Sequence, residues 1–122
     1  MNLTKTLNFR DEFGLPLELN DGTGNARWVV DVRGWDEARL FGTTRGGFTW
    51  GTAVLKLFAS HDGVAKLPLG VTLGPMTADG VLSTSDIDVQ TVNYLIIELF
   101  TAEGSPSWAE LELRLSKTSD RP

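Results

Sequence analysis

Apolar and polar residues alternate along most of this chain with a period of two, which is the pattern of β-strands that bury one face. The clearest example is the segment 108–116, where every second residue is apolar. The residues expected to face the interior are Ala109, Leu111, Leu113 and Leu115. Those expected to face solvent are Glu110, Glu112, Arg114 and Ser116. The segment therefore predicts an antiparallel strand with one solvated face.

Five more segments, all in the first half of the chain, predict strands: residues 3–9, 15–19, 28–32, 38–44 and 52–60. Both faces of 52–60 carry large apolar side chains, so we expect this strand to lie inside a sheet. Pro16 has no backbone N–H to donate, which favours an edge position for 15–19.

The second half of the chain is less regular. Glycine and proline interrupt residues 65–85, so only brief strands are expected there, around Val71 and Val81. Residues 86–89 predict a short connector, either extended or helical. Residues 93–101 are rich in β-branched and aromatic side chains and are the best candidate for a central strand. The turn signals between the predicted strands lie at 20–25, 45–47, 61–63 and 103–106.

Short strands separated by turn signals, with no helical period of useful length, predict an all-β fold. The expected architecture is an antiparallel β-sandwich or jelly roll, with a small β-barrel as the alternative. The length of 122 residues fits one domain, so residues 1–122 are expected to form a single β domain. Within it, residues 1–13 are a candidate extended N-terminal arm, and residues 117–122 are expected to be a polar tail.

Composition narrows the classes of function. The chain contains no cysteine, which excludes disulfides, thiolate metal sites and cysteine nucleophiles. Its net charge is −5 and its basic residues are scattered, so binding to nucleic acid is disfavoured. The first residues lack the apolar core of a signal peptide, and the longest apolar run, 94–100, is interrupted by Glu98 and too short to cross a membrane. We therefore expect neither secretion by a signal peptide nor a membrane partner.

His61 is the only histidine, and Ser60 and Asp62 flank it. A Ser–His–Asp triad needs three side chains that converge on one reacting atom. Adjacent residues at a strand end point to opposite sides instead. The Asp62-Gly63 pair is a common hairpin turn, so turn formation is favoured over catalysis.

Asp86 and Asp88 could place two carboxylates on one side of an extended segment. Such a pair can bind calcium or serve as the acid and base of a glycosidase. The later glycine and glutamate of an EF-hand loop are missing, however, so a solvated loop is favoured. A small hydrolase that uses these residues or Glu103 ranks last, and the sequence predicts no enzyme activity, no metal site and no cofactor.

Two groups of apolar residues are candidates for binding a partner. Leu3, Leu7 and Phe9 form a stripe that must be covered either by the chain's own core or by a neighbour. Trp35 and Trp50 lie in turn-rich stretches where an exposed indole could anchor a partner or stack on a sugar ring. The other tryptophans, Trp28 and Trp108, lie at strand starts and are expected in the core.

Four segments between Trp28 and Ser116 form a recognisable series. They are the stretch Val30-Asp31-Val32-Arg33-Gly34-Trp35, the strand Ala38-Arg39-Leu40-Phe41-Gly42, the turn Ser60-His61-Asp62-Gly63 and the strand Tyr94-Leu95-Ile96-Ile97. In these segments the chain resembles the small β-sandwich modules of tailed-bacteriophage virion proteins, such as head-decoration, head-fibre and tail-associated domains. The chain departs from the family pattern because it has no tryptophan just after Asp62-Gly63, and because its 65–85 stretch is longer.

The resemblance implies a non-enzymatic virion structural protein, a capsid decoration or accessory protein that binds neighbouring virion subunits. It further implies a homo-oligomer such as a trimer, made in the host cytoplasm and located in the virion. The alternative is a carbohydrate-binding, lectin-like β-sandwich that stacks sugars on Trp35 or Trp50.

Overall fold

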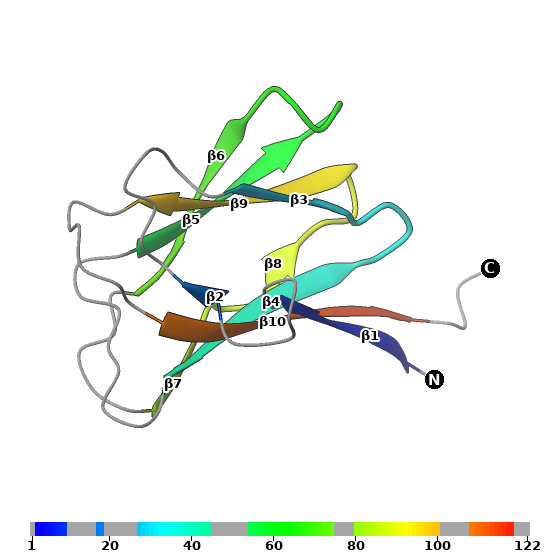
Figure 1. Cartoon of the computed structure of the whole chain (residues 1–122). Coiled ribbons are helices and arrows are strands. Elements are labelled where there is room, and N and C mark those ends of the chain that lie inside the picture. The colour runs from blue at the N-terminus through cyan, green and yellow to red at the C-terminus, as the bar shows by residue number, and fades with distance from the viewer. Residues whose placement is uncertain are drawn as a thin grey trace.

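The computed structural model describes residues 2–9, 17–18, 27–44, 54–74, 80–100 and 108–118 of the chain. These residues form strands joined by turns and contain no helix (Figure 1). The strands are β1 (Asn2–Phe9), β2 (Leu17–Glu18), β3 (Arg27–Asp31), β4 (Glu37–Thr44), β5 (Val54–Ser60), β6 (Leu67–Leu73), β7 (Gly80–Ser83), β8 (Ile87–Asp88), β9 (Tyr94–Phe100) and β10 (Trp108–Thr118). No helix in the part of the chain that is described is long and apolar enough to span a membrane.

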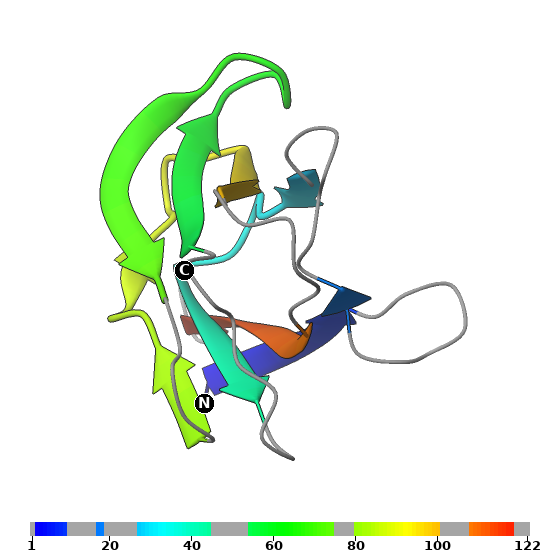
Figure 2. The same cartoon turned by 60° about the vertical axis from the view of Figure 1, so that its left-hand side comes forward.

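The strands form two antiparallel sheets that face each other (Figures 1 and 2). The first has the order β1-β10-β4-β7, with β2 paired to β10 and β8 paired to β4, and the second has the order β3-β9-β5-β6. This confirms the predicted all-β fold and is consistent with an antiparallel β-sandwich. The jelly-roll variant is not confirmed, and two separate sheets do not support the barrel alternative.

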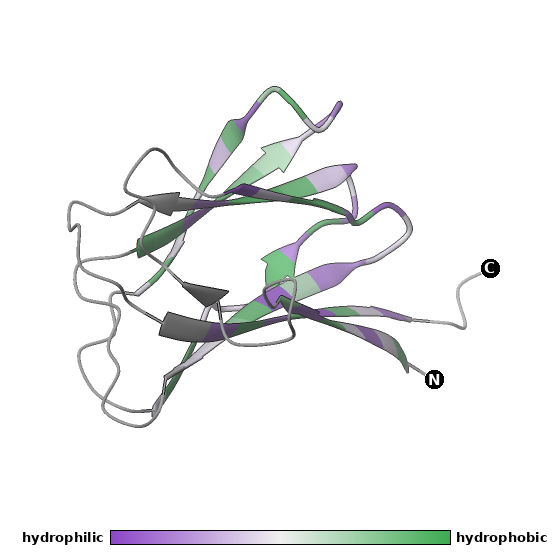
Figure 3. Ribbon diagram, in the orientation of Figure 1, coloured by the Kyte–Doolittle hydropathy of each residue, from purple (hydrophilic) through white to green (hydrophobic). Residues whose placement is uncertain are grey.

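The core lies between the two sheets, and its buried residues come mainly from β3, β4, β5, β9 and β10. Figure 3 shows hydrophobic and hydrophilic residues alternating along several strands. β10 confirms the facing predicted from its alternation, because Leu111, Leu113 and Leu115 are each at most 2% exposed. β9 lies between β3 and β5 and is the central strand that its composition predicted. The fully buried side chains that fill the core include Val32, Leu40, Leu55, Leu57, Leu95, Ile97, Leu113 and Leu115.

Several boundaries differ from the predictions. β6 spans Leu67–Leu73 and is longer than the brief strand expected around Val71. Ile87–Asp88 is extended, which decides between the two forms proposed for that connector. β10 continues through Thr118, so the segment expected to be a tail from residue 117 begins inside the sheet. The turns predicted at 20–25, 45–47 and 103–106 lie outside the described residues, as does Pro16.

The segment proposed as an N-terminal arm contributes an edge strand. β1 pairs with β10 along its whole length, from Asn2 opposite Thr118 to Phe9 opposite Leu111. Leu7 and Phe9 pack against the core of this chain, and the Phe9 ring lies 6.1 Å from the ring of Trp28. The pairing with β10 thus turns Leu7 and Phe9 toward the domain's own core, while their role in binding a partner stays a prediction. Leu3, the remaining member of the stripe, is 41% exposed.

Candidate functional site: the loop between β5 and β6

The loop of residues 61–66 joins β5 to β6 and folds over the outer face of the four-stranded sheet. Gly63 lies against Val29 and Tyr94, and its φ of +82° suits a residue without a side chain. The guanidinium of Arg27 donates to the carbonyls of Gly63 and Val64, at 3.5 and 3.0 Å. Arg27 and Val29 alternate with the inward-facing Val30, so both point to the outer face of the sheet. Because the loop contacts these two residues of β3, it crosses the outer face from β5 as far as β3.

Polar side chains at the start of the loop are used to hold its turn. Asp62 Oδ1 accepts hydrogen bonds from the backbone N–H groups of Val64 and Ala65, at 2.8 and 2.9 Å. Ser60 Oγ donates to Asp62 Oδ1 and accepts from the N–H of Gly63. The pKa of the Asp62 carboxyl is lowered, first by the Val64 N–H and then by that of Ala65. Asp62 therefore stabilises this turn in its ionised form.

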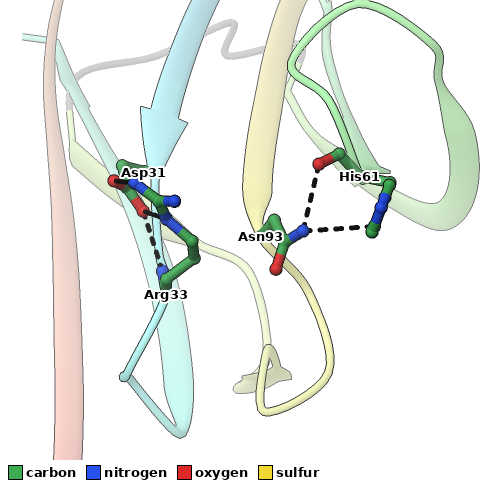
Figure 4. A network of polar contacts seen from close by, with 4 residues as sticks. All are labelled: Asp31, Arg33, His61 and Asn93. Atoms are coloured by element: carbon green, nitrogen blue, oxygen red, sulfur yellow. Dashed lines mark hydrogen bonds and ion pairs between the residues drawn. The ribbon is translucent and has the colours of Figure 1, made fainter.

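His61 is held from the turn that precedes β9 (Figure 4). Asn93 Nδ2 donates to the backbone carbonyl of His61 at 3.0 Å and lies 3.1 Å from His61 Nδ1. Among the described residues, the hydrogen-bond partner of the imidazole is thus Asn93, while Ser60 and Asp62 bond to each other. The arrangement has the geometry of a turn and does not converge on a reacting atom.

A second polar contact in Figure 4 fixes the end of β3. Arg33 donates from Nε and Nη2 to the two carboxylate oxygens of Asp31, at 3.0 and 2.6 Å. The same guanidinium lies over the ring of Tyr94, 5.4 Å from its centroid. Hydrogen bonds from the Arg33 side chain and backbone lower the pKa of Asp31 to about 2. The turn that leads from β3 to β4 is therefore tied to β9.

The far end of the loop is held by an ion pair. Lys66 Nζ lies 2.7 Å from Glu98 Oε2 and 4.8 Å from the centroid of the Phe58 ring. Glu98 is only 8% exposed, so Lys66 supplies the charge partner that a buried carboxylate requires. Ile96 lies on the same outer face and is fully buried. The loop thus covers an apolar residue of the central strand that would otherwise face solvent.

Three apolar side chains remain exposed on and beside this loop. Val64 is 71% exposed, Leu67 is 66% exposed and Val29 is 46% exposed. Of these three, Leu67 lines an open cavity of about 330 Å³, together with Ala59, Val92 and polar residues such as His61 and Lys66. The sequence predicted the turn but did not identify these exposed residues. The sequence does contain a sign of these exposed residues, because apolar residues resume directly after Asp62-Gly63.

The outer face of the other sheet carries a group of charges around Phe41. Arg39 and Arg114 lie directly opposite each other on β4 and β10, and both guanidinium groups lie over the Phe41 ring, at 5.9 and 4.7 Å from its centroid. Glu112 Oε2 lies 3.3 Å from the guanidinium of Arg114. Asp86 Oδ1 lies 2.9 Å from Arg39 Nε, and this second contact is an ion pair that lacks the alignment of a hydrogen bond. The carboxylates therefore compensate two like charges placed opposite each other.

The two aspartates proposed as a carboxylate pair have separate roles. Asp86 pairs with Arg39, whereas Asp88 Oδ1 accepts a hydrogen bond from the backbone N–H of Gln90 at 3.0 Å. Within the described residues, no three or more His, Cys, Asp or Glu side chains are grouped so that they could hold a metal ion. Glu103 lies outside those residues.

The tryptophans differ in their surroundings. Trp28 packs against the core, as predicted, and Trp35 does so as well. Lys117 Nζ lies 4.8 Å from the centroid of a Trp35 ring, so this indole is not an open platform. Leu3 lies opposite Lys117 in the β1–β10 pair, which places two of the proposed partner-binding residues, Leu3 and Trp35, next to one lysine. Trp50 and the side chain of Trp108 lie outside the described residues.

The sequence of this chain was also compared with known proteins. No protein-family model matches it, and a search of curated proteins finds no match.

Proposed function

We propose that this chain is a non-enzymatic structural protein that binds other protein subunits. Its resemblance to small virion modules assigns it to the capsid decoration or accessory proteins of tailed bacteriophages, located in the virion and made in the host cytoplasm. The observation that carries the proposal is the β5–β6 loop, which hydrogen bonds and an ion pair hold in place and which presents exposed apolar side chains.

These contacts matter because a loop that is already ordered loses little conformational entropy when it binds a partner. Val64 and Leu67 are the side chains that a partner would cover, because they are the most exposed of the large hydrophobic side chains that the structure describes. The side chains that could take part in hydrolysis, Ser60, His61 and Asp62, are instead hydrogen-bonded within the loop or to Asn93. These contacts favour a binding role over a catalytic one.

The test is made on particles. The chain would be tagged in the genome that encodes it, the released virions purified on a density gradient, and the copy number per particle measured by mass spectrometry. We expect the original chain to be present in a fixed copy number and Val64→Asp to be lost from the particles. Thr72→Asp is the matched control, because Thr72 is exposed on β6 of the same sheet but is not part of the loop.

Both variants must unfold at the temperature of the original chain for the comparison to hold. Absence of the original chain from purified particles would contradict the virion assignment. Equal incorporation of Val64→Asp and Thr72→Asp would contradict the role of the loop while leaving the assignment intact.

The carbohydrate-binding alternative now depends on Trp50, because Trp35 is packed against the core and lies beneath Lys117. A glycan array separates the two proposals. Binding of the original chain to an immobilised glycan, lost in Trp50→Ala, would favour the lectin-like function.

A further inference from the structure

β7 is the last strand of the sheet β1-β10-β4-β7, and it lies beside β4 at the border of that sheet (Figures 1 and 2). It pairs with β4 from Phe41 opposite Ser83 to Thr44 opposite Gly80. None of the strands that the structure describes pairs with its other side. All four residues of β7 are exposed, with Val81 62% and Leu82 38% exposed. Its outer edge therefore presents backbone groups and apolar side chains to solvent.

The attachment of β7 to β4 is firm. Directly after the strand, the buried Thr84 accepts a hydrogen bond at Oγ1 from the N–H of Leu40, at 3.1 Å. The N–H of Thr84 in turn donates to the carbonyl of Leu40 at 3.0 Å. This reciprocal pair fixes the end of β7 against an interior strand. The exposed edge is consequently held in the extended form that a further strand would need.

β7 also lacks the features that keep the other outer strands from pairing with neighbours. β1 carries Lys5, β3 carries Arg27 and Asp31, and β6 carries Pro68 next to a register shift opposite Leu57 and Phe58. Charges, prolines and bulges are the usual devices that protect sheet edges. The sequence of β7 is Gly-Val-Leu-Ser, with no charge and no proline.

The missing charge indicates which partner suits this edge. Copies of a chain with a net charge of −5 repel each other, so self-association is favoured where the contact brings no like charges together. An interface with two-fold symmetry places identical surfaces against each other, and an uncharged strand meets this requirement.

We propose that β7 pairs antiparallel with β7 of a second copy, which joins the two sheets into one continuous sheet. In an antiparallel pair, residues directly opposite each other point to the same face of the sheet. When two copies of β7 pair with two-fold symmetry, this holds only if one residue lies directly opposite the same residue of the second copy. Leu82 lies on the inward face, since it is opposite Gly42 on the side of β4 that carries Leu40. With Leu82 opposite the partner's Leu82, each outer-face Val81 lies opposite the partner's Ser83.

This register can be tested with exposed side chains alone. The variant V81K/S83K places lysines opposite lysines at two positions of the seam, and it should dissociate. The matched variant V81K/S83E places lysine opposite glutamate at the same positions, and it should associate. V81K/S83K also lowers the net negative charge of the chain, so its dissociation could not come from greater overall repulsion.

Sedimentation velocity over a concentration series gives the mass of each species, and thermal unfolding confirms that both variants fold. We expect a dimer for the original chain and for V81K/S83E, and a monomer for V81K/S83K. A monomeric original chain, a trimer in place of a dimer, or equal association of the two variants would overturn the proposal. Val64→Asp should still dimerise, so failure of this inference is distinguishable from failure of the proposed function.

Discussion

At the scale of single residues, the polar side chains of this domain mostly hold backbone in place. Asp62 and Asp88 accept N–H groups of the turns that follow them, and Thr84 and Asn93 join segments distant in sequence. The first kind of contact is local, so a sequence pattern such as Asp-Gly predicts it. The second kind depends on which strands become neighbours, and no local pattern carries that information.

Asp31 makes the turn after β3 sensitive to acid. Its pKa is lowered from 3.8 to about 2 in the folded chain, so its contribution to stability is fully present above pH of about 4 and is lost as the pH falls through about 2. Asp31→Asn should therefore lower the thermal midpoint at neutral pH, and most of the difference from the original chain should be lost by about pH 2.

Thermal unfolding followed by circular dichroism between neutral pH and about pH 2 measures this difference. Arg33→Gln removes the same pair from the other side, so it should have little further effect in the Asp31→Asn background. A difference between the original chain and Asp31→Asn that persists at the lowest pH would show that the carboxylate is not its source.

At the scale of elements, the strands were predictable where alternation was clean or apolar residues were dense. β10 and β9 are the two examples, because burial on one face or on both leaves a direct mark on the sequence. The length of β6 and the path of the loop before it were not predictable. The contact between Arg27 and Val64 joins residues 37 positions apart, and it forms only because β9 pairs with both β3 and β5 and so places them in one sheet.

The proposed partner-binding residues show the same limit of prediction from sequence. Leu3, Leu7 and Phe9 were correctly recognised as an apolar stripe, but the sequence could not say whether the core or a neighbour covers it. Register with β10 places Leu7 opposite the buried Leu113 and so turns it toward the core, whereas Leu3 in the same strand is 41% exposed.

The loop between β5 and β6 should contribute to stability as a cover for the sheet. Replacing residues 61–66 with Asn-Gly would give a tight hairpin but uncover Ile96 and leave Glu98 without Lys66. Exposing a buried isoleucine alone costs roughly 1.5–3 kcal/mol. We expect the free energy of unfolding in urea to fall by at least that amount.

Adding Glu98→Gln to the shortened chain removes the carboxylate that has lost Lys66 and should restore part of the loss. An unchanged free energy of unfolding in the shortened chain would mean that the loop does not shield the outer face of the sheet.

At the scale of the whole molecule, the N-terminal segment belongs to the sandwich. If residues 1–9 belonged to the extended arm that the sequence predicts, their deletion would leave a folded domain. The paired β1 strand predicts a different result, because deletion removes Leu7 and Phe9 from the core and exposes the edge of β10. We expect the thermal midpoint to fall clearly, since loss of partly buried large side chains costs on the order of 2–4 kcal/mol.

The control for this deletion is Thr4→Ser, which alters an exposed residue of β1 that lies opposite Ser116 and should leave the midpoint almost unchanged. An unaltered midpoint after deletion of residues 1–9 would instead identify this segment as a dispensable arm, as first expected.

The pairing of β1 with β10 also constrains how the domain is made. Asn2 lies opposite Thr118, so the first described strand has no partner until the last one has left the ribosome. Closing a loop of this length is entropically unfavourable, and folds dominated by such distant contacts reach the native state slowly. The nascent chain carries the apolar side of β1 uncovered until β10 has emerged. This interval, rather than the folded domain, is the stage at which a chaperone would have most to do.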